Sequence, residues 1–236
     1  MTVGKPMKML LKFTIPVFLG NVFQQLYSMA DAVIVGKFVG TKGLAAVGAT
    51  GTITFLIIGF LMGVTTGVTV LTSQKFGAGR MDEMRKTVGN AAILSAVIAV
   101  VMTAVSMLGM HRLLVFMHTP EDIFDGAYGY IMIICAGIFT QVLYNLVSSI
   151  LRALGNSKTP LYFLILAAGL NIVLDLVFII FFHWGAPGAA WATVISQGVS
   201  GVLCLIYMWK AVPELKMKKE DWYFNRDIAV KQISVG

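Results

Sequence analysis

Charge is scarce in this sequence. Asp, Glu, Lys and Arg make up only 12% of its 236 residues, whereas 58% are hydrophobic and the mean hydropathy is +0.84. A typical soluble domain carries about 25% charged residues, so the composition excludes a water-soluble protein. Several apolar runs are longer than about 18 residues and carry few charges, which is the pattern of membrane-spanning helices.

The sequence also lacks the motifs of several functional classes. Its two cysteines, Cys135 and Cys204, lie in different apolar runs without CxxC spacing, which argues against a disulfide framework or a zinc site. The three histidines lack metal-ligand spacing, and no Ser/His/Asp arrangement or Walker sequence occurs. The residues therefore give no support for an enzyme or for a bound cofactor.

The apolar runs predict an all-α membrane protein built as a six-transmembrane-helix bundle. The six predicted spans have the approximate limits 10–36, 46–73, 88–110, 128–150, 160–183 and 188–210. We expect residues 1–210 to form this bundle. We expect residues 211–236 to form a cytoplasmic or interfacial linker that leads towards a further part of the protein.

The distribution of positive charge predicts the orientation of the bundle. All 18 Lys and Arg residues except Lys37, Lys42 and Arg112 fall on one side when the six spans alternate. Cytoplasmic loops carry the excess of Lys and Arg, so both termini are expected inside and the bundle in the plasma (cytoplasmic) membrane. This placement also accounts for the net charge of +7 without a nucleic-acid partner.

Small residues mark one face of the second predicted span. Gly59, Gly63 and Gly67 form a GxxxGxxxG pattern. Small side chains let two helix backbones approach closely in lipid. The pattern therefore predicts a helix-packing face and no chemistry.

An acid, Asp31, interrupts the first apolar run. Read as a helix, this run carries one polar stripe, made of Asn21, Gln24, Gln25, Ser28 and Asp31. An ionisable group inside a spanning helix costs roughly 2.5–3.5 kcal/mol on insertion scales. The stripe therefore predicts contact with a protein interior or a water-filled cavity rather than with lipid.

A second acid, Asp175, lies in the fifth run, one helical turn after Asn171. The fourth and sixth runs add polar faces, made of Gln141, Asn145, Ser148 and Arg152, and of Thr193, Ser196, Gln197 and Ser200. Hydrogen bonds between helices explain most of these positions, but they do not require carboxylates. Asp31 and Asp175 could exchange a proton. Alternatively, they could be the metal ligands of a sodium site, together with oxygens of Asn171 and Thr193.

Several segments, in their order along the chain, resemble a known family. They are Pro16 fifteen residues before Asp31, VGKFVGTKGLAAVG, QKFGAG, LRALGNSKTP, GLNIVLD and GAPGAAWATVISQ. Together they resemble the amino-terminal six-helix lobe of a multidrug and toxic compound extrusion (MATE) transporter. The resemblance covers essentially the whole chain.

This resemblance implies a twelve-span antiporter with two six-helix lobes around a central cavity. It would export organic cations or amphipathic drugs while H⁺ or Na⁺ enters. Carried over by position, the ion-coupling residues are Asp31, Asn171, Asp175 and Thr193, and Pro16 is the point at which the first helix bends. Candidates for the substrate cavity are Asn21, Gln24, Tyr27, Asn145, Ser148 and Gln197, where Ser148 aligns with an asparagine that joins the ion site in some members.

Only one lobe is present in this sequence. Alternating access requires one helix bundle to move against another, so the expected partners are a second six-helix lobe, the lipid bilayer and a drug-like small molecule. The second lobe would belong to the same full-length chain or to a pairing subunit. Two alternatives remain, a lipid-linked saccharide flippase of the same superfamily, whose cavity tends to be lined with arginines, and a non-transporting membrane scaffold or half-protein.

Overall fold

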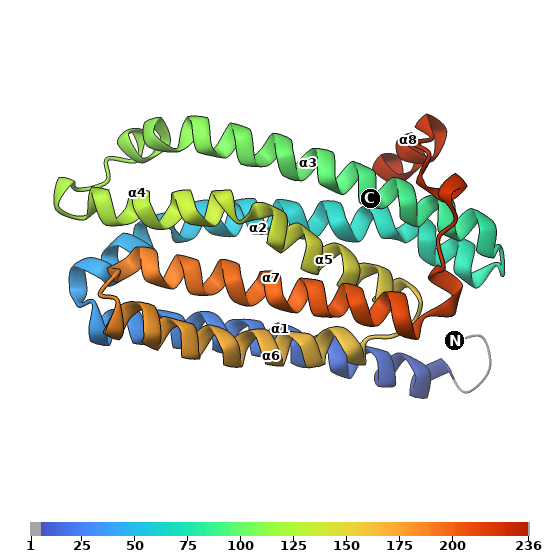
Figure 1. The fold of residues 1–236 in the computed structure, drawn as a ribbon, viewed down its shortest axis with the longest axis horizontal. Coiled ribbons are helices and arrows are strands. Elements are labelled where there is room, and N and C mark those ends of the chain that lie inside the picture. The colour runs from blue at the N-terminus through green and yellow to red at the C-terminus, as the bar shows by residue number, and fades with distance from the viewer. Residues whose placement is uncertain (1–5, 236) are drawn as a thin grey trace.

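The computed structural model describes residues 6–235, and every regular element in that range is helical (Figure 1). The elements are α1 (Pro6–Phe38), α2 (Thr41–Gly77), α3 (Met81–Phe116), α4 (Glu121–Ala136), α5 (Ile138–Ala153), α6 (Lys158–Leu176), the π-helical turn η1 (Val177–Phe181), α7 (Gly185–Ala211), the short 3₁₀ helices η2 (Pro213–Leu215) and η3 (Lys219–Trp222), and α8 (Arg226–Val235). The ends of the two predicted domains, residues 1–5 and 236, lie outside the described range.

The six predicted spans are all helical, and most of the helices are longer than the apolar runs. A helix satisfies its own backbone hydrogen bonds outside the lipid as well as inside it, so each helix can extend into the polar residues that flank the apolar run. The helices α2, α3 and α7, and α6 together with η1, are long and apolar enough to cross a membrane, with mean hydropathy from 1.6 to 2.6. The pair α4 and α5 makes a fifth span, bent by 47°.

The sixth helix of the bundle is α1, which is 33 residues long. Its polar stripe lowers its hydropathy, and it is not among the helices that qualify as spans on composition alone. It nevertheless packs along the whole bundle, mainly against α6 (Figure 1). The predicted six-helix bundle is therefore confirmed in its architecture.

The fourth predicted span is bent in the structure, a feature that the sequence did not indicate. The chain breaks at Gly137 between α4 and α5. A Cβ at Gly137 would lie 2.2 Å from Cγ2 of Val194 on α7, so only glycine allows this close approach. Because α7 packs against α4, α5 and α6, the bend lets one span follow the central helix.

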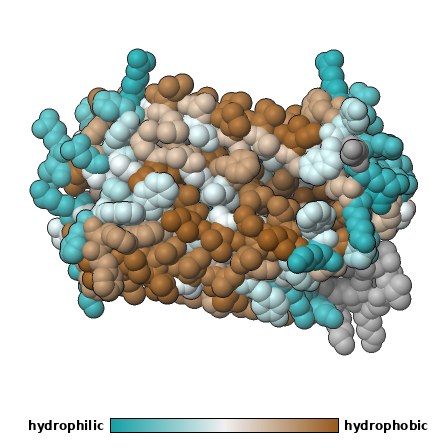
Figure 2. All heavy atoms as spheres, in the orientation of Figure 1, coloured by the Kyte–Doolittle hydropathy of each residue, from teal (hydrophilic) through white to brown (hydrophobic). Residues whose placement is uncertain are grey.

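The spans run up and down, so both ends of the described chain lie at the same end of the bundle (right in Figure 1). Lys37, Lys42 and Arg112 lie at or next to helix ends at the opposite end of the bundle. In the face shown in Figure 2, hydrophobic residues form a band across the middle and hydrophilic residues gather at both ends. Large apolar side chains such as Leu108, Phe116 and Phe55 are mostly exposed, as expected where lipid is the solvent. The arrangement fits the predicted topology, while the cytoplasmic assignment stays a prediction.

The GxxxGxxxG face of α2 does not pack inside this bundle. Gly59 and Gly63 are exposed, and a Cβ at either would meet nothing within 4 Å, whereas Gly67 is buried. The face that α2 turns towards its neighbours carries Ile57 and Leu61 instead. The predicted close packing at Gly59 and Gly63 is thus wrong within the described residues, because larger apolar side chains on another face bury more surface.

The segment after α7 packs against the ends of α2 and α3. The buried Gln232 side chain on α8 donates from Nε2 to the carbonyl oxygens of Val68 and Thr87, both at 2.9 Å. The Asn90 amide bonds the backbone of the same segment in both directions, donating to the carbonyl of Tyr223 (3.3 Å) and accepting from the N–H of Asn225 (2.9 Å). The described part of the predicted linker therefore packs against the six-helix lobe.

Candidate functional site

Two acids from helices far apart in sequence meet inside the bundle. Asp31 on α1 is 7% exposed and Asp175 on α6 is fully buried. They come together because α1 packs along α6. The two carboxyl groups are close enough for the charge of one to act on the other.

Thr193 on α7 forms hydrogen bonds with Tyr27 and Asn171, which lie near the two acids in sequence. Its Oγ1 accepts a hydrogen bond from the Tyr27 hydroxyl on α1 at 3.1 Å and a longer one from Nδ2 of Asn171 on α6 at 3.4 Å. Asn171 lies one turn before Asp175, so a helix places both on one face. Three helices thus meet at one polar cluster within an apolar bundle.

Several oxygens of this cluster have no hydrogen-bond donor. Among the described residues, Oδ1 of Asp31, both carboxyl oxygens of Asp175 and Oδ1 of Asn171 are buried without a partner. A buried polar atom left without a partner costs about 1–3 kcal/mol, and more when it is charged. All of these atoms are acceptors, so the cluster needs a donor or a positive charge.

The local backbone around Asp175 is irregular. The π-helical turn η1 begins two residues after Asp175, and π-helical turns are frequent at functional sites. On α7, Val194 follows Thr193 and packs against Gly137 at the bend between α4 and α5. The position of the Thr193 hydroxyl therefore depends on a glycine contact as well as on the polar cluster.

This arrangement can bind a small cation. Two neighbouring buried carboxylates repel each other unless a proton or a metal ion lies between them. The amide and hydroxyl oxygens beside them are hard ligands, which suit Na⁺ as well as the carboxylates do. Across residues 6–235 there is no group of three or more His, Cys, Asp or Glu side chains that could hold a metal, so only two carboxylates and neutral oxygens are available.

The MatE family model matches residues 16–177, which include Asp31, Asn171 and Asp175. This chain belongs to the MatE family. The family groups membrane transporters and not enzymes. Thr193, on the next helix, lies outside the matched range.

Known proteins similar to this MatE chain include "Probable multidrug resistance protein YpnP" of Bacillus subtilis. The two are 33% identical over 209 residues, which cover 89% of this chain and 47% of that protein. A MOP superfamily transporter from Pyrococcus furiosus superposes with a TM-score of 0.91 at 27% identity, over 98% of this chain and 51% of its own. An outward-facing multidrug resistance MATE family transporter gives a TM-score of 0.90 at 28% identity, over 98% and 51%. The chain thus spans about half the length of the relatives it matches.

The polar stripe on α1 does not lie in the interior of this MatE lobe. Asn21, Gln25 and Ser28 are exposed and Gln24 is half-buried, so only Asp31 points into the bundle. These side chains are not buried within this lobe, and the expectation that the stripe faces a protein interior or a water-filled cavity stays a prediction.

The remaining predicted residues lie near the cluster's helices but make no hydrogen bond to it among the described residues. Ser148 on α5 is buried with its hydroxyl unpaired, and Asn145 is half-buried. Gln197, one turn after Thr193, is buried with Oε1 unpaired. Pro16 is buried within α1, which continues through it as one helix.

Sequence reasoning missed Tyr130 on α4. This side chain is buried, and it lies close enough to Asp31 and Asp175 to interact with their charge. A tyrosine near the end of a predicted span is ordinarily an interface residue, so the sequence carried no signal for this position. Its proximity depends on the packing of α4 beside the other helices of the bundle.

Proposed function

We propose that this chain is the amino-terminal half of a secondary active multidrug exporter. The complete transporter would move organic cations or amphipathic drugs outward while H⁺ or Na⁺ enters. Membership of the MatE family and the similarity to a named multidrug resistance protein support the substrate class. The second six-helix lobe would complete the central cavity, from the same chain or from a pairing subunit.

The single observation that carries the ion coupling is the cluster of unpaired buried oxygens. The unpaired oxygens of Asp31, Asp175 and Asn171 are all hydrogen-bond acceptors, so they cannot bond to one another. A proton removes the deficit by turning one carboxyl into a donor. A sodium ion removes it by coordination to the same oxygens and to Thr193.

Coupling follows if ion and drug favour different conformations, because each then weakens binding of the other. One inward charge moving through 100 mV releases about 2.3 kcal/mol, enough for roughly fifty-fold accumulation of a neutral substrate. The α1 residues exposed on this lobe, Asn21, Gln25 and Ser28, would line the cavity on the drug's side. The two acids behind them would respond to the ion.

A saccharide flippase is less well supported by the charges inside the bundle. Among the residues whose burial the structure describes, the buried Asp, Glu, Lys and Arg side chains are those of Asp31, Asp175 and Asp221, and all three are acidic. Arg152 is half-buried at the end of α5. A cavity that binds an anionic lipid carrier would need buried basic residues, such as arginines, in place of these acidic ones.

The coupling ion can be identified by dye efflux from vesicles that contain the complete transporter. A proton gradient and a sodium gradient are imposed separately. We expect one gradient to drive efflux and the other to have little effect. Efflux driven by neither gradient would contradict ion coupling.

The role of the two acids is tested in the same vesicles with Asp31→Asn and Asp175→Asn. Either change removes an ionisable group but keeps the side-chain shape, so ion-driven efflux should fall to background while membrane insertion is unchanged. Asp122→Asn is the matched control, because Asp122 is an exposed aspartate that pairs with Lys42 at 3.6 Å. Normal efflux in Asp31→Asn would remove that residue from the mechanism.

A further inference from the structure

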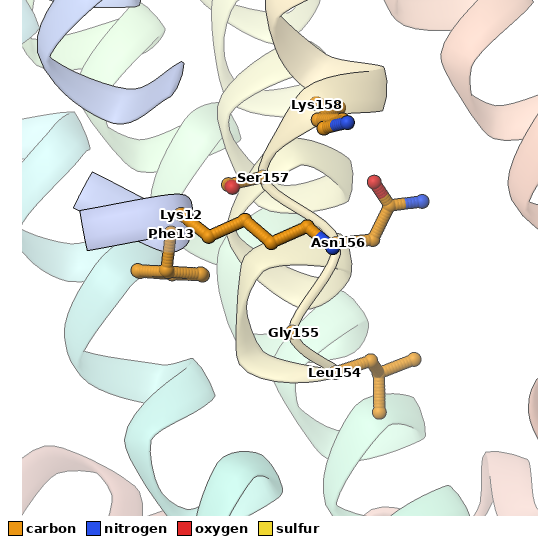
Figure 3. Close-up of a pocket in the computed structure, with 7 residues that line it drawn as sticks. All are labelled: Lys12, Phe13, Leu154, Gly155, Asn156, Ser157 and Lys158. Carbon is orange, nitrogen blue, oxygen red and sulfur yellow. The ribbon is translucent and has the colours of Figure 1, made fainter. Parts of the chain in front are cut away.

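A second polar site lies at the end of the bundle where the described chain begins. A cleft of about 540 Å³ opens between α1 and the loop that joins α5 to α6. Figure 3 shows the Lys12 side chain extending from α1 across this cleft towards Asn156 in the loop. The cleft is separate from the acidic cluster, which lies on α1 more than four turns further along the helix.

The charge of the cleft is positive. Lys12 and Lys158 both line it, and the lining contains no Asp or Glu. Within residues 6–235, neither lysine forms an ion pair. Lysines from two elements therefore border one space, and neither has a counter-charge among the described residues.

Ser157 supplies an unused hydrogen-bonding group. It is only 5% exposed and lines the cleft, with its hydroxyl oxygen drawn on the α1 side of the loop in Figure 3. Ser157 occupies the N-cap position of α6 but makes no capping bond, and it bonds to no other described side chain. Asn156 does the capping instead, with Oδ1 accepting from the N–H of Thr159 at 3.1 Å. The Ser157 hydroxyl is therefore available to a group bound in the cleft.

The start of α6 adds a favourable field. This helix is 19 residues long and begins at Lys158, so the positive end of its dipole points at the cleft. Thr159 is already capped and Pro160 has no N–H, so the helix contributes its field and few direct amide bonds. Cations, a hydroxyl donor and a helix N-terminus are the combination that binds phosphate groups.

We propose that the cleft between Lys12, Ser157 and Lys158 binds a phosphate-bearing group. The lysines supply charge, the Ser157 hydroxyl donates one hydrogen bond, and the α6 dipole orients the group. The site lies beside the loop between α5 and α6, at one end of the bundle (Figure 1), and lipid headgroups meet membrane-spanning helices at their ends. A free phosphate ion offers the same chemistry.

Occupancy would act on the first turns of α1. Pro16 has no N–H to donate to the carbonyl of Lys12, so the helix is weakest at that point. A phosphate that bridges Lys12 to the α5–α6 loop would tie the segment before Pro16 to the rest of the lobe. This effect does not require the acidic cluster.

The two sources are distinguished by separate titrations of the complete transporter in an uncharged detergent. One arm adds phosphatidylglycerol, with phosphatidylcholine as the zwitterionic reference, and counts bound lipid by native mass spectrometry. The other arm adds inorganic phosphate and follows thermal unfolding. Lys12→Gln, Lys158→Gln and Ser157→Ala are compared with wild type. Lys231→Gln is the control, because this exposed lysine lies on α8 at the same end of the bundle.

Each lysine substitution should weaken binding about fivefold, the effect of one basic residue near an anionic group, and the control should bind like wild type. If the lysine variants bind phosphatidylglycerol more weakly than wild type, the ligand is a lipid headgroup. If they bind inorganic phosphate more weakly than wild type, the ligand is a free phosphate. Either result supports the site. Binding that is absent from both arms, or equal in all variants, overturns it.

Discussion

At the scale of single residues, the site depends on which polar atoms lack partners. Asp31, Asn171, Asp175 and Thr193 were predicted from the sequence as one site, because polar residues in apolar helices are rare and costly, and the structure brings their helices together. Their role in ion coupling stays a prediction. The sequence was not enough to place Tyr130. Sequence periodicity fixes which residues share a face but not which way the face turns, since helix rotation is set by neighbouring helices.

Tyr27→Phe tests the support of Thr193. The change removes a hydroxyl that donates to Thr193 Oγ1 at 3.1 Å, and hydrogen bonds between helices in membranes are worth about 0.6 kcal/mol. We expect the ion concentration for half-maximal efflux to change by about threefold, with coupling retained. Tyr162→Phe, at an exposed tyrosine on α6, is the control. Complete loss of coupling would mean that Tyr27 takes part directly in ion transfer.

At the scale of elements, the six helices were predictable because apolar runs of spanning length have few alternatives. The break at Gly137 and the turn η1 were not, since both depend on contacts with α7. The packing of residues 213–235 against α2 and α3 could not be predicted from the sequence either. It rests on hydrogen bonds from Gln232 and Asn90 to backbone groups more than a hundred residues away in sequence.

Gly89→Ala tests that docking. A Cβ at Gly89 would lie 2.0 Å from the carbonyl oxygen of Asp221, so the segment must move away from α3. We expect a loss of stability on the order of 1–3 kcal/mol and faster proteolytic cleavage after Val212.

Gly109→Ala is the control for this change, because Gly109 is on the same helix with nothing within 4 Å of a Cβ. Helix propensity alone favours alanine at both positions by about 0.8–1 kcal/mol. If the two variants had the same melting temperature and cleavage rate, the contact between Gly89 and Asp221 would not hold the segment in place.

At the scale of the whole molecule, the bundle has one end rich in Lys and Arg, and this predicts its direction in the membrane. The direction cannot be read from helix packing, because the same bundle fits a bilayer either way. The contacts of the exposed glycines Gly59 and Gly63 are also a property of the whole molecule. What they contact depends on surroundings outside this lobe.

Cysteine labelling tests the direction. Glu121→Cys, at the start of α4, should react with a membrane-impermeant maleimide in intact cells. Gly79→Cys, between α2 and α3, should react only after the membrane is permeabilised. The native cysteines Cys135 and Cys204 are buried, so background labelling should be low. The reverse pattern would invert the proposed topology.

The central claim is that Asp31 and Asp175 hold the ion that a drug displaces. Because antiport requires each ligand to weaken the other's binding, drug added to the purified complete transporter should release the bound ion. A pH indicator detects H⁺ and a sodium-selective electrode detects Na⁺. We expect ion release from the wild type and none from Asp31→Asn. Undiminished release from Asp31→Asn would show that Asp31 does not hold the ion.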